Sequence, residues 1–290
     1  MSGKPVLIID SCSDLPAEIV EALGVEVLNF PYTIAGEEHL DDFGRSQSHA
    51  DFYAAMRAGD HPTTAQIPRA VFLETFRAHA AAGEPVLYLG FSSALSGTFD
   101  VGWLARQDVL AEFPDAEIRL VDTKAAAVAE GLLVYEAALR WRDGMPLAEI
   151  EAWATAQRPR LNGWFIVDDL ETLRRGGRLH GAVAAAGSLL DVKPLLRVAD
   201  DGKLEVRKSI RGRQKSMRTL ADLVAERAEA PETQTIAVAH GDCAEDAARL
   251  RELIADRVAV KDVITMEVGP VIGTHTGPGM LAVVFWGATQ

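Results

Sequence analysis

Hydroxyl side chains gather directly after an apolar run in the stretch FSSALSGTF, residues 91–99. Three serines and one threonine follow the run VLYLG (86–90). A hydroxyl beside a base can act as a nucleophile, as in a hydrolase. Several hydroxyls together can instead donate hydrogen bonds to the anionic head group of a ligand. The rest of the sequence has to distinguish these two kinds of site.

Three further loops carry polar side chains of similar kinds. They are DSCSD (10–14), TTAQ (63–66) and GTHTGPG (273–279). The loops at 10–14 and 92–98 each follow a predicted strand. Ligands of open parallel sheets bind beyond the carboxyl ends of the strands, and the free N–H groups of helix N-termini attract anions. These loops are therefore suited to binding an anion.

Each loop also has a purely structural interpretation. Serine and threonine are ordinary N-caps of helices, and Asp10 can hydrogen-bond its own turn. A single histidine such as His275 is more often structural than functional. The glycines around His275 favour a site, however, because glycine lets a ligand approach the backbone.

Motifs for metals and nucleotides are absent from the sequence. The pattern G-x-x-x-x-G-K-[ST] of P-loop kinases does not occur, and no G-x-G-x-x-G follows the first predicted strand. There is no H-E-x-x-H or C-x-x-C motif, and the seven histidines show no metal spacing. We therefore expect no metal site, no cofactor and no ATP site in this chain.

A serine acyl hydrolase is the main alternative to a binding site. Ser96 follows a predicted strand and opens a predicted helix, and the chain order Ser96, Asp168, His275 matches one hydrolase class. The nucleophile elbow of that class needs Gly-x-Ser-x-Gly, whereas Ala94 and Thr98 flank Ser96. Thr98 is bulky for so tight a turn, which disfavours the hydrolase but leaves it open.

The composition is that of a soluble globular protein. The chain has 290 residues, of which 48% are hydrophobic and 24% are charged. The formal net charge of −13 disfavours general binding to nucleic acid or to anionic membranes, although we allow for transient membrane contact. The start MSGKPVLIID lacks the apolar core of a signal peptide, and no apolar run is long enough to span a bilayer. We therefore expect a cytoplasmic protein.

Positive charge is concentrated in one segment, residues 174–218. This segment contains twelve Lys and Arg residues and four acidic ones, a net charge of +8, so the remainder of the chain carries −21. A basic block in an acidic protein favours an anionic ligand or partner. A solvated basic face without any ligand is the structural alternative.

Apolar runs alternate with helical patterns through the first half of the chain. Short runs such as PVLIID (5–10) and PVLYLG (85–90) predict buried parallel strands joined through helices. We expect VEVLNFPYTI (25–34) to be a strand with an edge or a bend at Pro31. The N-terminal domain, residues 1–159, is therefore predicted to be α/β, with a parallel sheet covered by helices.

The pattern changes in the second half of the chain. Two alternating runs around Asp-Gly predict a β-hairpin over 195–210. The runs DVITMEVG (262–269) and MLAVVFWG (280–287) predict strands that flank a loop over 270–279. We expect a C-terminal α/β domain, residues 160–290, with a mixed sheet and helices.

Seven stretches of the chain, in order, resemble the DegV family of bacterial fatty-acid-binding proteins, and together they cover nearly the whole chain. They are IIDSCSDLP (8–16), TTAQIP (63–68), FSSALSGTF (91–99), VDTKAAAVAEGLLV (121–134), VDDLETLRRGGRL (167–179), GSLLDVKPLL (187–196) and PVIGTHTGPGML (270–281). Three positions depart from the family pattern. Ala65 and Ile67 replace the usual serine and proline of the second stretch, and Cys12 stands where serine or threonine is common.

The resemblance implies a two-domain carrier, rather than an enzyme, with one long-chain fatty acid buried between the domains. The best understood members of this family present the acid to a separate fatty acid kinase, which makes an acyl-phosphate for phospholipid synthesis. By match of motif, Thr64 and Ser96 would hold the carboxylate, and His275 and Arg178 would lie near the head group. Three further residues are expected in the same head-group region, namely Thr274, Ser93 and Asp10.

The basic block then has an expected role in docking the kinase. Arg174 and Arg175 lie in a glycine-containing turn, and Arg211 and Lys215 extend the same charge along the chain. A lipid sensor that never hands its ligand over is the third alternative, beside the carrier and the hydrolase.

Physical chemistry assigns different tasks to the two ends of a fatty acid. A chain of about sixteen carbons contributes roughly 11 kcal/mol from its methylenes, at about 0.8 kcal/mol each, before the costs of association. The carboxylate must not be buried without donors, and the hydroxyls of the polar loops can supply them. The alanine-rich segment 182–190, part of a predicted helical stretch over 181–190, is either a tunnel lining or an ordinary packed helix.

Overall fold

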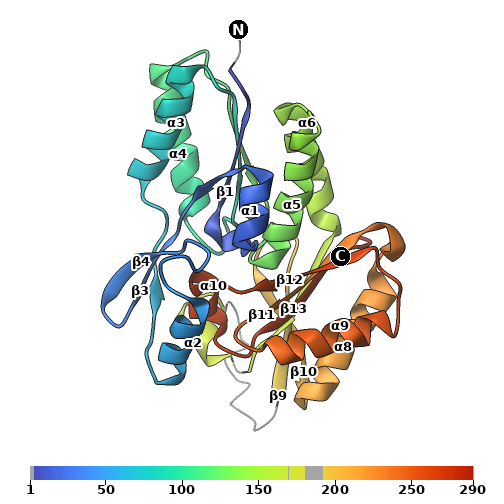
Figure 1. The fold of residues 1–290 in the computed structure, drawn as a ribbon. Coiled ribbons are helices and arrows are strands. Elements are labelled where there is room, and N and C mark those ends of the chain that lie inside the picture. The colour runs from blue at the N-terminus through green and yellow to red at the C-terminus, as the bar shows by residue number, and fades with distance from the viewer. Residues whose placement is uncertain (1–2, 169, 180–191, 290) are drawn as a thin grey trace.

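The computed structural model describes residues 3–168, 170–179 and 192–289 (Figure 1). The expected helical stretch at 181–190, and with it the candidate tunnel lining at 182–190, lies outside these residues. Two large sheets and one small sheet make up the described β-structure. The predicted α/β class, with a parallel N-terminal sheet and a mixed C-terminal sheet, is confirmed.

The N-terminal sheet has four parallel strands in the order β2-β1-β6-β7. Their bounds are Glu26–Leu28 (β2), Val6–Asp10 (β1), Val86–Gly90 (β6) and Ile118–Asp122 (β7). All five residues of β6 are buried, and so are four of the five in β1. This burial explains the continuous apolar runs, because helices cover both faces of a parallel sheet.

Five helices connect and cover the strands of this sheet. They are α1 (Ala17–Leu23), α3 (Arg69–Ala82), α4 (Thr98–Glu112), α5 (Val128–Arg142) and α6 (Leu147–Gln157). Helices α3 and α4 lie on one side of the strands, and α1, α5 and α6 lie on the other (Figure 1). The N-termini of α4 and α5 therefore start at the carboxyl ends of β6 and β7, where ligands of such sheets bind.

The C-terminal sheet has six strands in the order β10-β9-β8-β13-β11-β12, of which only β11 and β12 are parallel to each other. The bounds are Leu161–Ile166 (β8), Val192–Val198 (β9), Leu204–Arg211 (β10), Thr235–His240 (β11), Asp262–Glu267 (β12) and Leu281–Trp286 (β13). The predicted hairpin is the β9–β10 pair, which turns at Gly202 with a positive φ of 85°.

Alternating side chains of this sheet face two different cores. On β13, Val283 and Phe285 pack with the helices α8 (Arg213–Arg227) and α9 (Ala244–Ala255). Ala282 and Val284 on the same strand belong to the core shared with the first half of the chain. The sheet therefore turns one face to its own helices and the other to the N-terminal half.

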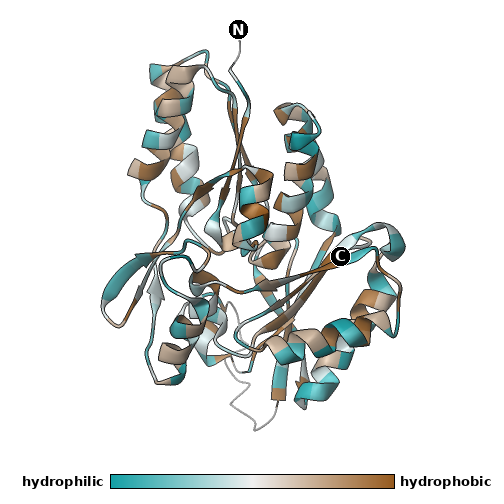
Figure 2. Cartoon of the chain, viewed as in Figure 1, coloured by the Kyte–Doolittle hydropathy of each residue, from teal (hydrophilic) through white to brown (hydrophobic). Residues whose placement is uncertain are grey.

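A third sheet was not expected from the sequence. It consists of the antiparallel strands β3 (Pro31–Ile34), β4 (Glu37–Leu40) and β5 (Thr63–Thr64), with β3 in the middle. Figure 2 shows β4 in hydrophilic colours. The prediction of one strand over 25–34 was wrong, because the chain leaves the parallel sheet after Leu28 and joins the small sheet at Pro31.

The segment 270–279 was expected to be a loop, and this was also wrong. Residues Pro270–Thr276 form the helix α10, which begins with proline in its first turn. Inside the helix, the hydroxyl groups of Thr274 and Thr276 donate to the carbonyls four residues earlier, at 2.8 and 3.1 Å. Helix α10 contacts β5, α7 (Glu171–Arg175) and α2 (His49–Arg57).

The expected domain boundary falls in the short 3-10 helix Arg158–Arg160, directly before β8. The division into domains 1–159 and 160–290 stays a prediction.

Candidate functional site

A largely apolar cavity lies between the carboxyl ends of the parallel strands and the inner face of the C-terminal sheet. It encloses about 810 Å³, including open solvent at its mouth. The first half of the chain supplies residues from five segments, namely the end of β1, Phe30 before β3, strand β5, the loop after β6 and the start of α5. The second half supplies residues of β8, β9, β10, α10 and β13. A concave, mainly apolar lining with a few polar groups is typical of a small-molecule site.

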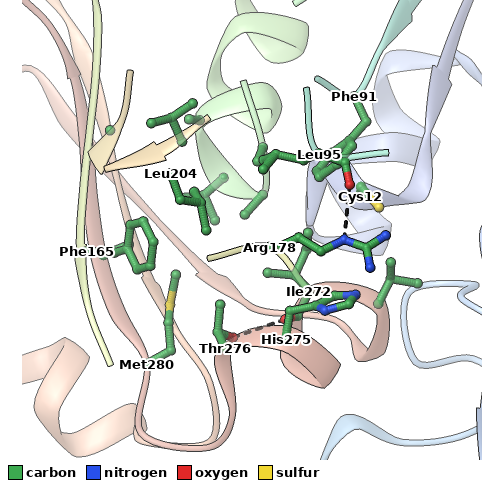
Figure 3. Close-up of a pocket in the computed structure, with 18 of the residues that line it drawn as sticks. Cys12, Phe91, Leu95, Phe165, Arg178, Leu204, Ile272, His275, Thr276 and Met280 are labelled. Atoms are coloured by element: carbon green, nitrogen blue, oxygen red, sulfur yellow. Dashed lines mark hydrogen bonds between the residues drawn. The ribbon is translucent and has the colours of Figure 1, made fainter. Parts of the chain in front are cut away.

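Polar side chains of four separate segments line the same cavity. They are Thr64 on β5, Ser96 before α4, Arg178 after α7 and His275 on α10. Figure 3 shows Arg178 between Leu95 and His275, with Phe165 and Met280 on the opposite side of the cavity. The structure therefore brings together all four residues that the family resemblance assigned to the head-group end.

Thr64 and His275 form a direct hydrogen bond. Their Oγ1 and Nε2 atoms are 2.9 Å apart, although the two residues are separated by 211 positions in the sequence. Thr64 is held in place because β5 pairs with β3, where Thr64 lies opposite Tyr32. His275 is held by α10, which packs against β5.

The imidazole of His275 is neutral at physiological pH. Burial lowers the pKa of His275 to about 4, and the nearby positive charge of Arg178 adds to this effect. Its Nδ1 atom is buried and has no hydrogen-bond partner among the described residues. This atom faces Gly176, where an added Cβ would lie only 2.1 Å from it. Gly176 thus leaves room for the ring of His275.

Arg178 brings a positive charge to the cavity. Its Nε donates to the carbonyl of Leu95 at 3.1 Å, and its Nη1 donates to the carbonyl of Gly176 at 2.6 Å. Within the described part of the chain it forms no salt bridge with a carboxylate. Burial lowers the pKa of Arg178 below its usual value, but an arginine stays charged. A half-buried cation with no acidic partner favours an anionic ligand.

Ser96 ties the loop after β6 to the first turn of α4. Its hydroxyl donates to Oγ1 of Thr98 at 3.0 Å, and the Thr98 N–H donates back to Ser96 Oγ at 3.2 Å. Thr98 Oγ1 also accepts the N–H of Ile67 at 3.2 Å. These bonds join the second and third polar loops of the sequence, so that Thr64 and Ser96 reach one cavity.

Ser93 and Asp10 lie elsewhere, since neither is among the residues that line the cavity. Ser93 Oγ donates to Asp122 and accepts from Lys124 Nζ at 2.8 Å. The carboxylate of Asp10 accepts the N–H of Phe91 at 2.9 Å and the hydroxyl of Tyr88 at 2.7 Å. Burial raises the pKa of Asp10 to about 6. Asp10 therefore joins β1 to β6 and stabilises the strand ends beside the cavity without lining it.

Thr274 lines a second, outer hollow of about 740 Å³ that adjoins the polar end of the cavity. Three residues, Thr64, Arg178 and His275, line both spaces. The other lining residues of the outer hollow include Met56, Pro62, His61 and Arg175, and the side chains of the last two are 2.6 Å apart. The polar end of the cavity thus lies next to the molecular surface.

The four expected docking residues are all exposed. Arg174 is paired with Glu171 at 2.7 Å, and Arg175 contacts His61. Arg211 ends β10 and Lys215 lies in the first turn of α8. In the described residues, neither Arg211 nor Lys215 forms a salt bridge.

The Ser-His-Asp relay of a hydrolase is not assembled in this structure. His275 bonds Thr64, while the Ser96 hydroxyl bonds Thr98. The Asp168 carboxylate pairs with Lys193 at 2.8 Å and lies 3.6 Å from Arg213. Asp168 therefore does not orient the imidazole as the third member of a triad would.

Sequence reasoning missed most of the apolar lining. Residues 126–129 at the start of α5 belong to the run AAAVAE, and their small side chains leave space for the cavity. Cys12 also lines the cavity, and burial raises the pKa of its thiol well above the ordinary value. It is a protonated small side chain rather than a reactive thiolate.

Comparison with known proteins places the chain in a family. The family model described as "Uncharacterised protein, DegV family" matches residues 4–287. The chain belongs to the DegV family. A DegV domain-containing protein of Clostridium perfringens is 42% identical over 287 residues, which cover 99% of both chains.

Solved structures of DegV proteins share the fold. A DegV family protein from Thermus thermophilus, described by its fatty acid binding, is 30% identical, with a TM-score of 0.87 over 98% of this chain and 100% of that one. DegV of Bacillus subtilis, described as a fatty-acid-binding protein, is 27% identical, with a TM-score of 0.83 over 98% and 99% of the two chains.

Among the described residues, no helix has both the length and the apolar character needed to cross a bilayer. The same residues contain no group of three or more His, Cys, Asp or Glu side chains that could hold a metal ion.

Proposed function

We propose that this protein binds one long-chain fatty acid in the cavity, with the carboxylate at the polar end beside Thr64, Ser96 and Arg178. The observation that supports it best is the combination of a mainly apolar lining with these donors at one end. The fatty acid binding described for the relatives from Thermus thermophilus and Bacillus subtilis points the same way.

The tail of the ligand supplies most of the affinity in this proposal. Each buried methylene contributes about 0.8 kcal/mol, so a chain of about fourteen methylenes contributes roughly 11 kcal/mol before the costs of association. Large apolar side chains such as Phe91, Leu95 and Phe165 line the cavity, and in the proposal they contact the acyl chain of the ligand.

The head group is held by a charge and by hydroxyls. The guanidinium of Arg178 and the hydroxyl of Thr64 donate to the carboxylate, since a buried anion requires donors. The Ser96 hydroxyl rotates from its bond with Thr98 to donate as well. His275 is neutral because of its low pKa, so it adds a hydrogen bond to Thr64 without adding a second positive charge.

The bound acid is then presented to a separate fatty acid kinase. A carboxylate oxygen attacks the γ-phosphorus of the kinase's ATP, and ADP leaves, which gives an acyl-phosphate for phospholipid synthesis. The outer hollow supports this step because it adjoins the head-group end. The kinase docks on the face that carries Arg174, Arg175, Arg211 and Lys215.

The first test is the identity of the molecule that leaves the purified protein on denaturation. We expect mass spectrometry to find long-chain fatty acids in near-stoichiometric amount. Delipidated protein should take up a fatty acid again and reject its methyl ester, since the ester lacks the carboxylate. Protein that neither retains nor takes up any fatty acid would contradict the proposal.

A further inference from the structure

The cavity adjoins a second hollow on the surface, distinct from the one at the head-group end. This hollow is lined by Lys124, Arg158, Pro159 and Asp200, among others, and encloses about 580 Å³ with open solvent included. It shares three lining residues with the cavity, namely Ala129, Gly163 and Val198, and none with the outer hollow at the head-group end. In the described residues, the cavity therefore approaches the surface at two separate places.

The three shared residues, which we call the wall, lie where the cavity and this hollow meet. Ala129 lies in the first turn of α5, Gly163 on β8 and Val198 at the end of β9. Gly163 lies on the same face of β8 as Phe165, another lining residue, because side chains two positions apart share a face. A Cβ added at Gly163 would lie 3.2 Å from Ala129 Cβ and 4.0 Å from Val284 Cγ2. A single methyl group added at residue 163 would therefore reduce the space in this part of the cavity.

The far side of the wall is polar. Lys124 Nζ lies 2.7 Å from the Asp122 carboxylate, and Arg158 Nη1 donates to the Asp122 carbonyl at 2.9 Å. A methylene of the ligand that extended past the wall would leave an apolar lining and enter this charged hollow, which is open to solvent. That methylene would not contribute the transfer free energy that drives binding of the tail.

We propose that the wall of Ala129, Gly163 and Val198 sets the chain-length limit of the bound fatty acid. This inference rests on the proposed function, since it takes the carboxylate to lie at Arg178 and the methyl end to reach the wall. The length of the acyl chain is then selected at the end of the cavity remote from the residues that hold the head group.

Two substitutions should move the limit in opposite directions. Gly163→Ala adds one methyl group at the wall, so the preferred chain becomes shorter by one or two carbons. Val198→Ala removes two methyl groups, so the preferred chain becomes longer. Because one buried methylene corresponds to roughly a fourfold change in affinity, the ratio of uptake between neighbouring chain lengths should change by about that factor.

The experiment offers delipidated protein an equimolar series of saturated fatty acids from lauric to arachidic acid and quantifies the bound acids by mass spectrometry after extraction. Asp200→Asn, in the second hollow on the far side of the wall, is the matched control and should keep the wild-type profile. The double variant Gly163→Ala/Ala129→Gly moves the methyl group across the same contact and should restore the wild-type profile in part. Thermal unfolding of each variant checks that it is folded.

The possible outcomes separate this inference from the function on which it rests. Opposite shifts in the two single variants support the wall as the limit. Variants that bind with the wild-type profile overturn the inference and leave fatty acid binding intact. A wild-type protein that takes up no member of the series overturns both. If Gly163→Ala fails to fold, Val198→Ala decides alone, since it removes atoms and introduces no clash.

Discussion

A substitution of Arg178 tests the proposed function most directly. It lies half-buried at the polar end of the cavity, and no carboxylate in the described residues forms a salt bridge with it. In a carrier, the ligand itself supplies the missing anion. The positive charge of Arg178 therefore contributes most to stability when a bound carboxylate pairs with it.

Substitution of Arg178 by Gln should weaken fatty acid binding by roughly ten- to a hundredfold, as expected for the loss of a charge-assisted hydrogen bond of about 1.5–3 kcal/mol. Titration of delipidated protein with palmitate measures the change. The matched control is Arg174→Gln, because Arg174 is exposed and paired with Glu171. Equal affinities of the wild type and the Arg178 variant would show that the carboxylate lies elsewhere.

The serines of FSSALSGTF show how far residue-level prediction from sequence could go. The cluster lies at the edge of the cavity, as expected for a candidate site, but the three serines have three different roles. Ser92 donates to the carbonyl of Gly202 at 2.9 Å, Ser93 bonds Asp122 and Lys124, and only Ser96 lines the cavity. The direction of a side chain in a loop depends on distant partners, which a local pattern does not contain.

Helix α10 carries His275 and is fixed at its start by two buried carboxyl groups. Asp14 Oδ1 accepts the N–H of Gly269 at 2.9 Å. A Cβ added at Gly269 would lie 3.1 Å from Asp14 Oδ1 and 3.0 Å from Asp41 Oδ2, so both carboxyl groups surround this residue. Each has one buried oxygen without a partner in the described residues. Two such groups cannot both ionise without cost.

This arrangement predicts a pH dependence of stability. Burial raises the pKa of Asp41 from 3.8 to about 7, although His49 counteracts it, and burial also raises the pKa of Asp14. The folded chain binds the Asp41 proton more tightly than the unfolded chain does. The resulting stabilisation is complete below 3.8 and is lost as the pH rises through about 7.

As the pH rises from 3.8 to about 7, the free energy of unfolding should therefore fall less for Asp41→Asn than for the wild type. The difference between the two falls is at most about 4 kcal/mol. Urea unfolding on both sides of the window measures the free energies. The exposed Asp100→Asn should follow the wild type. Parallel pH profiles for wild type and Asp41→Asn would show that this carboxyl group does not hold the proton.

At the scale of elements, the long apolar runs were predictable and the short elements were not. Buried strands such as β1 and β6 consist of continuous apolar residues, which identify them locally. The two-residue strand β5 exists only because β3 pairs with it. Helix α10 has glycine, proline and threonine in a sequence that favours a loop, and its packing against β5, α7 and α2 overrides that preference.

At the scale of the whole molecule, the segment 174–218 is basic and the remainder of the chain is acidic, and we propose that exposed cations of this segment form the face that docks the kinase. Arg211 and Lys215 are exposed at the end of β10 and the start of α8, and no salt bridge within the described residues neutralises them. The proposed kinase partner would meet this face with acidic residues. Complementary charge at the rim of an interface acts mainly on the rate of association.

The double variant Arg211→Glu/Lys215→Glu should slow association with a fatty acid kinase by roughly tenfold at low salt and leave palmitate affinity unchanged. Biolayer interferometry with the purified kinase measures the rate. Arg142→Glu, at the exposed end of α5, reverses a charge outside the basic segment 174–218 and is the matched control. Unchanged docking of the double variant would refute this face.

The cavity takes its lining from both halves of the chain: Phe91 and Leu95 come from the first, and Phe165 and Met280 from the second. In the proposed carrier, a lipid molecule that contacts both halves binds only the folded state, so uptake shifts the unfolding equilibrium in proportion to the logarithm of ligand concentration over Kd. The protein without ligand then has the lower free energy of unfolding. It is the first to unfold on heating and the first to be cleaved by proteases, so the supply of lipid determines the lifetime of the protein.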